Sequence, residues 1–123
     1  MPTIRIQAIA PQRCDIGEML TRCTAAAAQA LGIPQNYCWA IFQPVEPGTY
    51  VEGDCIWSSA DAGRAAPLIS ITALEGRTEE LKAAVLRATA GVVAEALAVP
   101  LAQVFAEYRD IPKGQAFSGG SIC

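Results

Sequence analysis

The chain has 123 residues, a formal net charge of −3, and 52% apolar against 17% charged residues. This length fits one compact domain, and so much apolar content excludes a disordered chain. No apolar run approaches the roughly 20 residues needed to cross a bilayer. The nine Lys and Arg residues are dispersed, which argues against a nucleic-acid surface. We expect neither a membrane nor a nucleic acid among the partners.

Strand, helix and strand are predicted twice in chain order. Residues 3–9 alternate as a half-buried strand, Asp15 caps a helix that ends before Gly32, and residues 37–45 form the next strand. In the second half, residues 68–74 form a strand, and Thr78 caps a helix. Its apolar stripe is predicted at Leu81, Val85, Ala88, Val92 and Ala96. Residues 104–111 give the closing strand, the link 46–66 carries two short strands, and 117–122 adds a last one.

The two halves are repeats of each other. Residues 30–34 (ALGIP) reappear as residues 96–100 (ALAVP), and Trp39 and Phe105 keep that spacing. Pro2 has its counterpart in Pro67. We therefore predict one α+β domain over 1–123, built from repeats at about 2–50 and 67–120. Right-handed crossovers give a β-α-β-β-α-β sheet of four strands with both helices on one face. The other face is expected to be widely apolar, so oligomerisation through that face is predicted.

Histidine is absent and five cysteines are present. The absence excludes Ser-His-Asp and Cys-His catalysis and His-ligated metal sites. The cysteines form no CxxC pair and match no zinc spacing. We expect no metal site, a reducing cytoplasmic setting, and mostly buried cysteines that act as small apolar side chains.

Several motifs resemble the tautomerase superfamily, above all 4-oxalocrotonate tautomerase and its fused, double-length relatives. They are Pro2 directly after Met1, the segment 74–78 (LEGRT) at a strand–helix junction, and 112–114 (PKG) followed by Gly119 and Gly120. The resemblance implies a homotrimer of fused subunits that needs no metal or cofactor. It also implies catalysis by the amine of an N-terminal proline, here Pro2.

Physical chemistry supports Pro2 as a base once Met1 is removed. A free α-amine titrates near 8, and burial and nearby cations lower that pKa toward neutrality, as general acid–base catalysis requires. Otherwise Pro2 merely begins a strand. Pro67 lies inside the chain and must be catalytically silent.

Arg77 is the second predicted catalytic residue. It directly precedes the cap Thr78, where the helix N-terminus already favours an anion, and an arginine there can bind a carboxylate through two parallel bonds. The resemblance implies that it also polarises the developing enolate. The bland alternative is a solvated arginine at a helix start. Arg13, near the matching place in the first repeat, is a weaker candidate for substrate binding.

Trp39 and Phe105 stand where short family members carry a second arginine. Their presence argues for an apolar or aromatic monoacid rather than a dicarboxylate, although both side chains can equally be core residues. Arg109 either replaces the missing charge or only pairs with Glu107 or Asp110. Tyr50 aligns with an aromatic wall of the family's pocket.

The predicted function is a keto–enol tautomerase acting on a 2-hydroxydienoate or enolpyruvate-type carboxylate. A dehalogenase or decarboxylase of the same superfamily, acting on a three-carbon acid, is an alternative. The Tyr and Glu pair expected of the cis-3-chloroacrylic acid dehalogenases is replaced by Glu107 and Ser118, and the decarboxylase aspartate by Tyr37. A non-catalytic trimer for binding or signalling is the third hypothesis.

Overall fold

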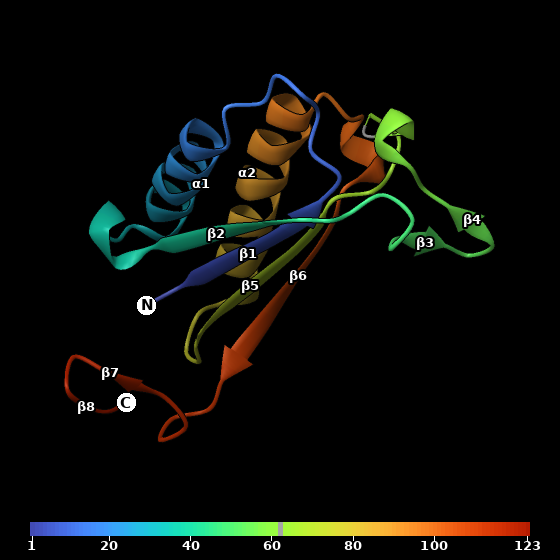
Figure 1. Cartoon of the computed structure of the whole chain (residues 1–123). Helices are drawn as coiled ribbons and strands as arrows, with labels where there is room; N and C mark the ends of the chain where they lie inside the picture. Colours follow the sequence, from blue (N-terminus) through green and yellow to red (C-terminus); the bar gives the residue numbers. More distant parts are fainter. Residues whose placement is uncertain (62) are drawn as a thin grey trace.

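The computed structural model describes residues 1–61 and 63–123. Two helices lie over one face of a four-stranded sheet (Figure 1), which confirms the predicted α+β fold. The helices are α1 (Ile16–Leu31) and α2 (Glu79–Leu97). The sheet contains β1 (Thr3–Ala8), β2 (Trp39–Pro44), β5 (Leu68–Leu74) and β6 (Phe105–Ile111). Two small hairpins lie outside it: β3 (Val51–Glu52) with β4 (Cys55–Ile56), and β7 (Phe117–Ser118) with β8 (Ser121–Ile122).

The sheet order is β2-β1-β5-β6. Within each repeat the strands run parallel, as β1 with β2 and β5 with β6, whereas the central pair β1 and β5 is antiparallel. The two repeats therefore point in opposite directions. We call the end of the sheet where β1 starts and β5 stops the Pro2 end, and the opposite one the Pro67 end.

Both helices begin at the predicted caps. The side chain of Asp15 accepts a hydrogen bond from the Glu18 N–H at 3.0 Å, and that of Thr78 accepts one from the Leu81 N–H at 3.2 Å. Each bond satisfies one of the free N–H groups that a helix N-terminus leaves unpaired. Helix α1 stops at Gly32, whose φ of 68° lies in the left-handed region that glycine tolerates.

The core lies between the sheet and the helices. Its strand side is made of Ile4, Ile6, Ile69 and Ile71, all buried. On α2 the predicted stripe is correct at Val85, but from there on the buried side chains lie one residue later than predicted, at Thr89, Val93 and Leu97, with Ala94 beside them. The predicted Leu81, Val92 and Ala96 pack against the core but are only partly buried. The polar Thr89 can occupy this face because its hydroxyl donates to the Val85 carbonyl at 2.8 Å.

Element ends differ slightly from the predictions. The strand expected over 37–45 is shorter, because residues 35–37 form a turn of 3₁₀ helix. The strand expected over 117–122 is instead the β7–β8 hairpin, which Gly119 and Gly120 turn with φ values of 62° and 86°. The expectation that most cysteines are buried is wrong: Cys23 and Cys38 are buried, but Cys14 and Cys123 are only half-buried and Cys55 is exposed at a hairpin.

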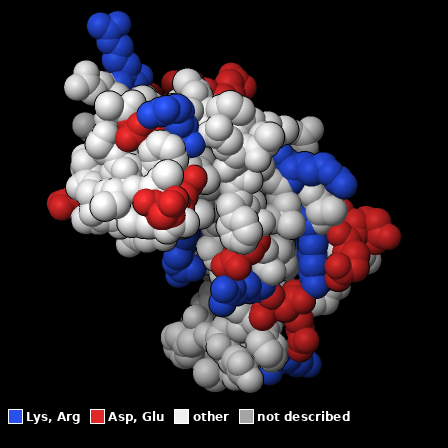
Figure 2. Space-filling view, turned by 90° about the vertical axis from the view of Figure 1, so that its right-hand side faces the viewer, with Lys and Arg blue, Asp and Glu red and all other residues white. Residues whose placement is uncertain are grey.

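The sheet face away from the helices is not uniformly apolar, and that expectation needs correction. Its middle is polar, because β1 and β5 place Arg5, Gln7 and Ser70 there. Large apolar side chains stand instead on the edge strands, where Trp39 is 53% and Phe105 58% exposed. On the side of the molecule shown in Figure 2, basic and acidic side chains are interspersed rather than gathered by sign.

Candidate active site at the Pro2 end

Pro2 is buried at the start of β1, and its carbonyl accepts a hydrogen bond from the Trp39 N–H at 3.0 Å. The repeat reproduces this arrangement at the other end, where buried Pro67 accepts a bond from the Phe105 N–H at 3.1 Å. The duplication seen in the sequence is therefore also present in the hydrogen bonds. Because β1 and β5 are antiparallel, the two prolines lie at opposite ends of the sheet.

Arg77 lies in the turn that follows β5, at the same end as Pro2. Gly76 has a φ of 119°, which side-chain-bearing residues rarely adopt, so glycine is needed in this turn. The Glu75 N–H donates to the Ile111 carbonyl at 3.0 Å, and its carboxylate accepts from the Lys113 N–H at 2.8 Å. The turn that carries Arg77 is thus anchored to the end of β6.

The guanidinium of Arg77 is little used by the fold. In the described chain its hydrogen bonding is limited to one long contact, 3.4 Å, with the carbonyl of Leu74. The side chain is half-buried. Most of its donors therefore remain available for an external acceptor.

Two positive charges act on the thiol of Cys38. Burial raises the pKa of the Cys38 thiol above its ordinary value, while Arg77 and the N-terminal ammonium group both lower it. Cys38 directly precedes Trp39, whose N–H binds Pro2. The N-terminus, Arg77 and the start of β2 therefore meet in one electrostatic neighbourhood.

A hollow of about 140 Å³ opens at this place. Its lining comes from the N-terminus, the ends of all four strands of the main sheet and the C-terminal hairpin. The residues are Met1, Thr3, Trp39, Leu74, Ile111, Ala116, Phe117, Ser118 and Cys123. Most of these side chains are apolar, so a ligand here would be partly desolvated. Neither Pro2 nor Arg77 lines the hollow itself; each is next to it, Pro2 between Met1 and Thr3 in the chain and Arg77 through its contact with the carbonyl of Leu74.

Three of the predicted substrate-binding residues lie elsewhere in the chain. Arg13, Tyr50 and Phe105 belong to the Pro67 end, because Arg13 follows β1 and Phe105 starts β6. The hydroxyl of Tyr50 donates to the Ala66 carbonyl at 2.7 Å, and burial, aided by Glu52, raises the pKa of Tyr50 to about 12. Within one chain, the structure does not bring these three together with Pro2.

Arg109 lies on the open face of β6 and is paired with Glu107, with N–O distances of 3.1 and 3.2 Å. The pairing that the sequence allowed is therefore present. Along the sheet register, Trp39, Thr3, Thr72 and Arg109 form one row. Three strand spacings of about 4.8 Å separate the ends of this row, or about 14 Å. Within one chain, Arg109 and Trp39 stand on opposite edges.

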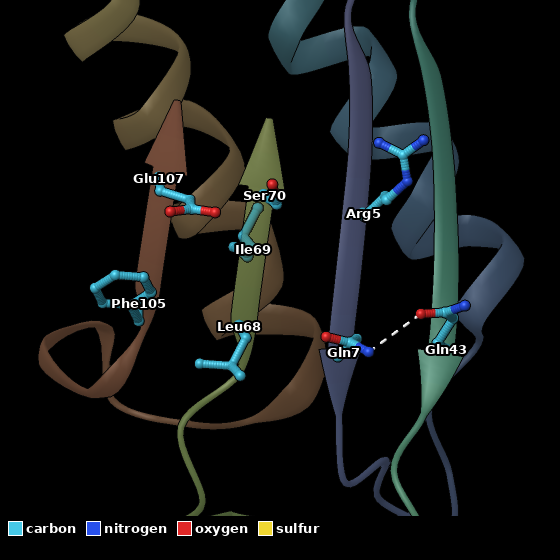
Figure 3. Close-up of a pocket in the computed structure, with 8 residues that line it drawn as sticks. All are labelled: Arg5, Gln7, Gln43, Leu68, Ile69, Ser70, Phe105 and Glu107. Atoms are coloured by element: carbon cyan, nitrogen blue, oxygen red, sulfur yellow. Dashed lines mark hydrogen bonds between the residues drawn. The ribbon is translucent and has the colours of Figure 1, made fainter. Parts of the chain in front are cut away.

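A larger hollow, about 370 Å³, lies on the open face of the sheet. Figure 3 shows it between polar side chains of β1, β2, β5 and β6, with Gln7 donating to Gln43 at 3.2 Å. The guanidinium of Arg5 points away from Gln7, toward the start of β1, where it donates to the Thr3 hydroxyl at 3.2 Å. The two hollows lie along the same strand, because Arg5 of β1 lines this one and Thr3 of β1 lines the one at the Pro2 end.

Sequence reasoning missed Cys38, the anchor Glu75, and the C-terminal hairpin as a wall. The glycine pair Gly119 and Gly120 could have predicted the hairpin turn. Nothing in the sequence indicated that the hairpin lines the same hollow as Met1. Among residues 1–61 and 63–123, no helix is long and apolar enough to cross a membrane, and no cluster of three or more potential ligands could hold a metal ion.

Solved structures of other proteins share this fold. Native fused 4-OT is 26% identical, with a TM-score of 0.84, covering 98% of this chain and 94% of its own. The chain has the tautomerase fold, in its fused 4-OT form. A fused 4-OT solved as a symmetric trimer matches at 23% identity and a TM-score of 0.84, with the same coverage. A protein inactivated by 2-oxo-3-pentynoate matches this tautomerase fold at 21% identity and a TM-score of 0.85, also with that coverage. No family model and no curated protein matches the chain.

Proposed function

We propose that the protein is a cofactor-independent keto–enol tautomerase with one active site per chain, at the Pro2 end. The observation that supports this proposal is that Pro2, the turn that carries Arg77 and a mostly apolar hollow bounded by Met1, Thr3 and Leu74 all lie at the same end of the sheet. The fused 4-OT relatives support the same reaction class. The proposed substrate is a small enol carboxylate, such as a 2-hydroxydienoate or an enolpyruvate.

The proposed reaction moves one proton. Removal of Met1 frees the secondary amine of Pro2, which takes the enol proton and returns a proton to a carbon of the substrate. Arg77 binds the carboxylate and stabilises the dienolate formed between the two transfers. No net oxidation occurs and no group leaves. Pro67, as an internal amide, has no basic nitrogen and takes no part.

We also propose that the functional form is a cytoplasmic homotrimer, as in the fused 4-OT solved as a symmetric trimer. The exposed apolar side chains of the two edge strands support self-association, because soluble monomers rarely expose such patches.

The N-terminus and an enol panel test the proposal. Mass spectrometry should show that Met1 is absent, and phenylenolpyruvate or 2-hydroxymuconate should be ketonised. Pro2→Ala should lose about 10²-fold or more in rate, the scale of a general base. The keto acid 2-oxo-3-pentynoate, which inactivates a structural relative, should add covalently to the N-terminal peptide.

Other outcomes would assign other functions. Release of halide or CO₂ from three-carbon acids, without ketonisation, would favour the dehalogenase or decarboxylase. Retained Met1 with no turnover would favour a binding module. Full ketonisation by Pro2→Ala would refute the amine mechanism.

A further inference from the structure

Arg5 stands in the middle of the open face of the sheet, the face away from the helices. Across the strands it lies in one row with Ile41, Ser70 and Glu107. Its side chain is exposed, and its guanidinium turns toward the start of β1 (Figure 3), where it donates to the Thr3 hydroxyl at 3.2 Å. In the described part of the chain its hydrogen bonding is limited to that neutral hydroxyl. Most of its five N–H donors are therefore left for another acceptor.

The positive charge of Arg5 is not compensated within the described chain. The four strands carry two further charged side chains on this face, Glu107 and Arg109, and these pair with each other at 3.1 Å. None of the ion pairs formed among residues 1–61 and 63–123 includes Arg5. The middle of the face therefore keeps one net positive charge, which attracts an anion.

A hollow of about 190 Å³ opens beside Arg5, between β1 and β2. Its walls include Trp39 and Ile41, which are 53% and 51% exposed and lie two residues apart on β2. An apolar cavity of about 150 Å³ can hold a benzene ring, so a body of that size fits here next to the guanidinium. The planar fork of an arginine matches a carboxylate through two parallel hydrogen bonds. The ligand chemistry that fits is a small carboxylate with a ring-sized apolar body.

We propose that the open face binds such an apolar carboxylate as an effector, with the anionic group on Arg5 and the apolar body against Trp39 and Ile41. Arg77 does not line this hollow, so a carboxylate on Arg5 leaves the proposed catalytic arginine free. Binding at Arg5 does not depend on the tautomerase activity. Its effect on the rate does rest on that proposed function.

Thr3 couples the effector hollow to the one at the Pro2 end. Both hollows are lined by Thr3 and Trp39. Thr3 directly follows Pro2, and its hydroxyl accepts from Arg5 and donates to the Thr72 carbonyl at 3.5 Å. A carboxylate that takes the Arg5 donors would remove the first of these bonds and cancel a positive charge near the Pro2 amine. Because a nearby cation favours the uncharged, basic form of an amine, the effector should slow the proposed ketonisation.

Calorimetric titration with benzoate, on the full chain in its native assembly, tests the site. The wild type should bind benzoate, and Arg77→Gln should still bind it at Arg5. Arg5→Gln should lose about 10- to 100-fold in affinity, the range for a hydrogen bond to a charged group. Arg87→Gln is the matched control, because Arg87 is also an exposed arginine but lies on α2, and it should bind like the wild type. Equal affinity in Arg5→Gln, loss of binding in Arg77→Gln, or no binding by the native assembly would overturn the site.

A second variant keeps the test decisive should Arg5→Gln be unstable. Ile41 is the register partner of Arg5 on β2, so Ile41→Glu would place a carboxylate beside the guanidinium as a cross-strand ion pair. This variant should lose benzoate binding, whereas Ile41→Gln, which adds no charge, should bind at least several-fold more tightly than Ile41→Glu. Undiminished binding by Ile41→Glu would contradict the role of Arg5.

Inorganic phosphate is the second probe. It should bind more weakly than benzoate, because it has no apolar body to place against Trp39 and Ile41. Equal or tighter binding of phosphate would show a plain anion site and would overturn the assignment of an apolar carboxylate.

Initial rates with phenylenolpyruvate test the coupling. Benzoate should lower the kcat of the wild type even at saturating substrate, because substrate does not displace a ligand from a separate site, and Arg5→Gln should be insensitive. Inhibition that vanishes at saturating substrate, equally in both proteins, would place benzoate at the Pro2 end and overturn the effector role. A wild type inactive on the whole enol panel would refute the proposed function, and the site at Arg5 would then be decided by calorimetry alone.

Discussion

Replacing Arg77 by glutamine should remove activity while leaving the fold almost unchanged. The structural cost is small, because the guanidinium makes one long hydrogen bond, 3.4 Å to the Leu74 carbonyl, and is only half-buried. Losing such a contact costs up to about 1 kcal/mol of unfolding free energy. The cap of α2 at Thr78 does not involve the Arg77 side chain. Thermal unfolding of Arg77→Gln should therefore resemble that of the wild type.

The expected loss of activity is much larger. A charged hydrogen bond to a substrate carboxylate contributes about 1.5 to 3 kcal/mol, and a bidentate pair lies at the upper end of that range. At about 1.4 kcal/mol per tenfold change, 3 kcal/mol corresponds to about 10²-fold in kcat/KM. Initial rates with phenylenolpyruvate, over a range of concentrations, measure this ratio. Arg87→Gln is the matched control, because Arg87 is an exposed arginine on α2, in the layer on the other side of the sheet.

A second measurement reports the electrostatics without any substrate. Arg77 lowers the pKa of the Cys38 thiol, against the larger opposing effect of burial. Removing the charge should therefore raise the pKa of Cys38 further and slow its alkylation at a given alkaline pH. Peptide mapping after iodoacetamide treatment, in steps of pH, follows Cys38 separately from the other four thiols. Retention of kcat/KM within about threefold, together with an unchanged alkylation profile, would refute the placement of Arg77 at this site.

Two further predictions concern the frame around the site. Gly76→Ala should destabilise the fold by about 1 to 3 kcal/mol, because a φ of 119° is strained for alanine, and calorimetry measures this loss. The rate of ketonisation should also fall, because Arg77 shifts with the turn. Unchanged stability and unchanged rate would contradict the role of this turn. For Lys82, the hydrogen bond to the Asp110 carboxylate raises the pKa of the ammonium group above its ordinary value. Since the folded-state pKa is the higher one, this stabilisation is fully present below the unfolded lysine pKa of about 10.4 and is lost as the pH rises through the folded value. The difference in Tm between wild type and Lys82→Met should therefore vanish at strongly alkaline pH, and a constant difference would contradict the pairing.

The sequence was sufficient for the architecture because the relevant signals are local. Asp15 and Thr78 cap their helices through bonds three residues away, and such bonds depend on short segments alone. The repeat predicted the same strand–helix–strand order for the second half of the chain. The preference for right-handed crossovers then left few possible sheet topologies. The buried face of α2 was harder to predict, because small alanines surround the helix and Thr89 satisfies its own hydroxyl.

The site was only partly predictable, for a geometric reason. Matching residues by their spacing in the repeat places equivalent groups in equivalent positions, but the repeats run antiparallel, so equivalent positions lie at opposite ends. Trp39 and Phe105 are such a pair, and Pro2 and Pro67 are another. Arg13 and Tyr50 follow the first repeat to the Pro67 end. Combining the repeat with the strand directions, rather than with spacing alone, would have separated the two ends.

The two ends of the sheet differ in what surrounds their prolines. At the Pro67 end the chain continues through the proline, and the link closes over it. The Tyr50 hydroxyl donates to the Ala66 carbonyl, and the Glu52 carboxylate accepts from the Ala66 N–H at 2.6 Å. At the Pro2 end a hollow of about 140 Å³ is lined by Met1, Thr3 and Leu74, and Arg77 contacts the carbonyl of Leu74. Fusion of two repeats can leave only one terminal amine, and the polar groups around the internal proline serve to hold the junction.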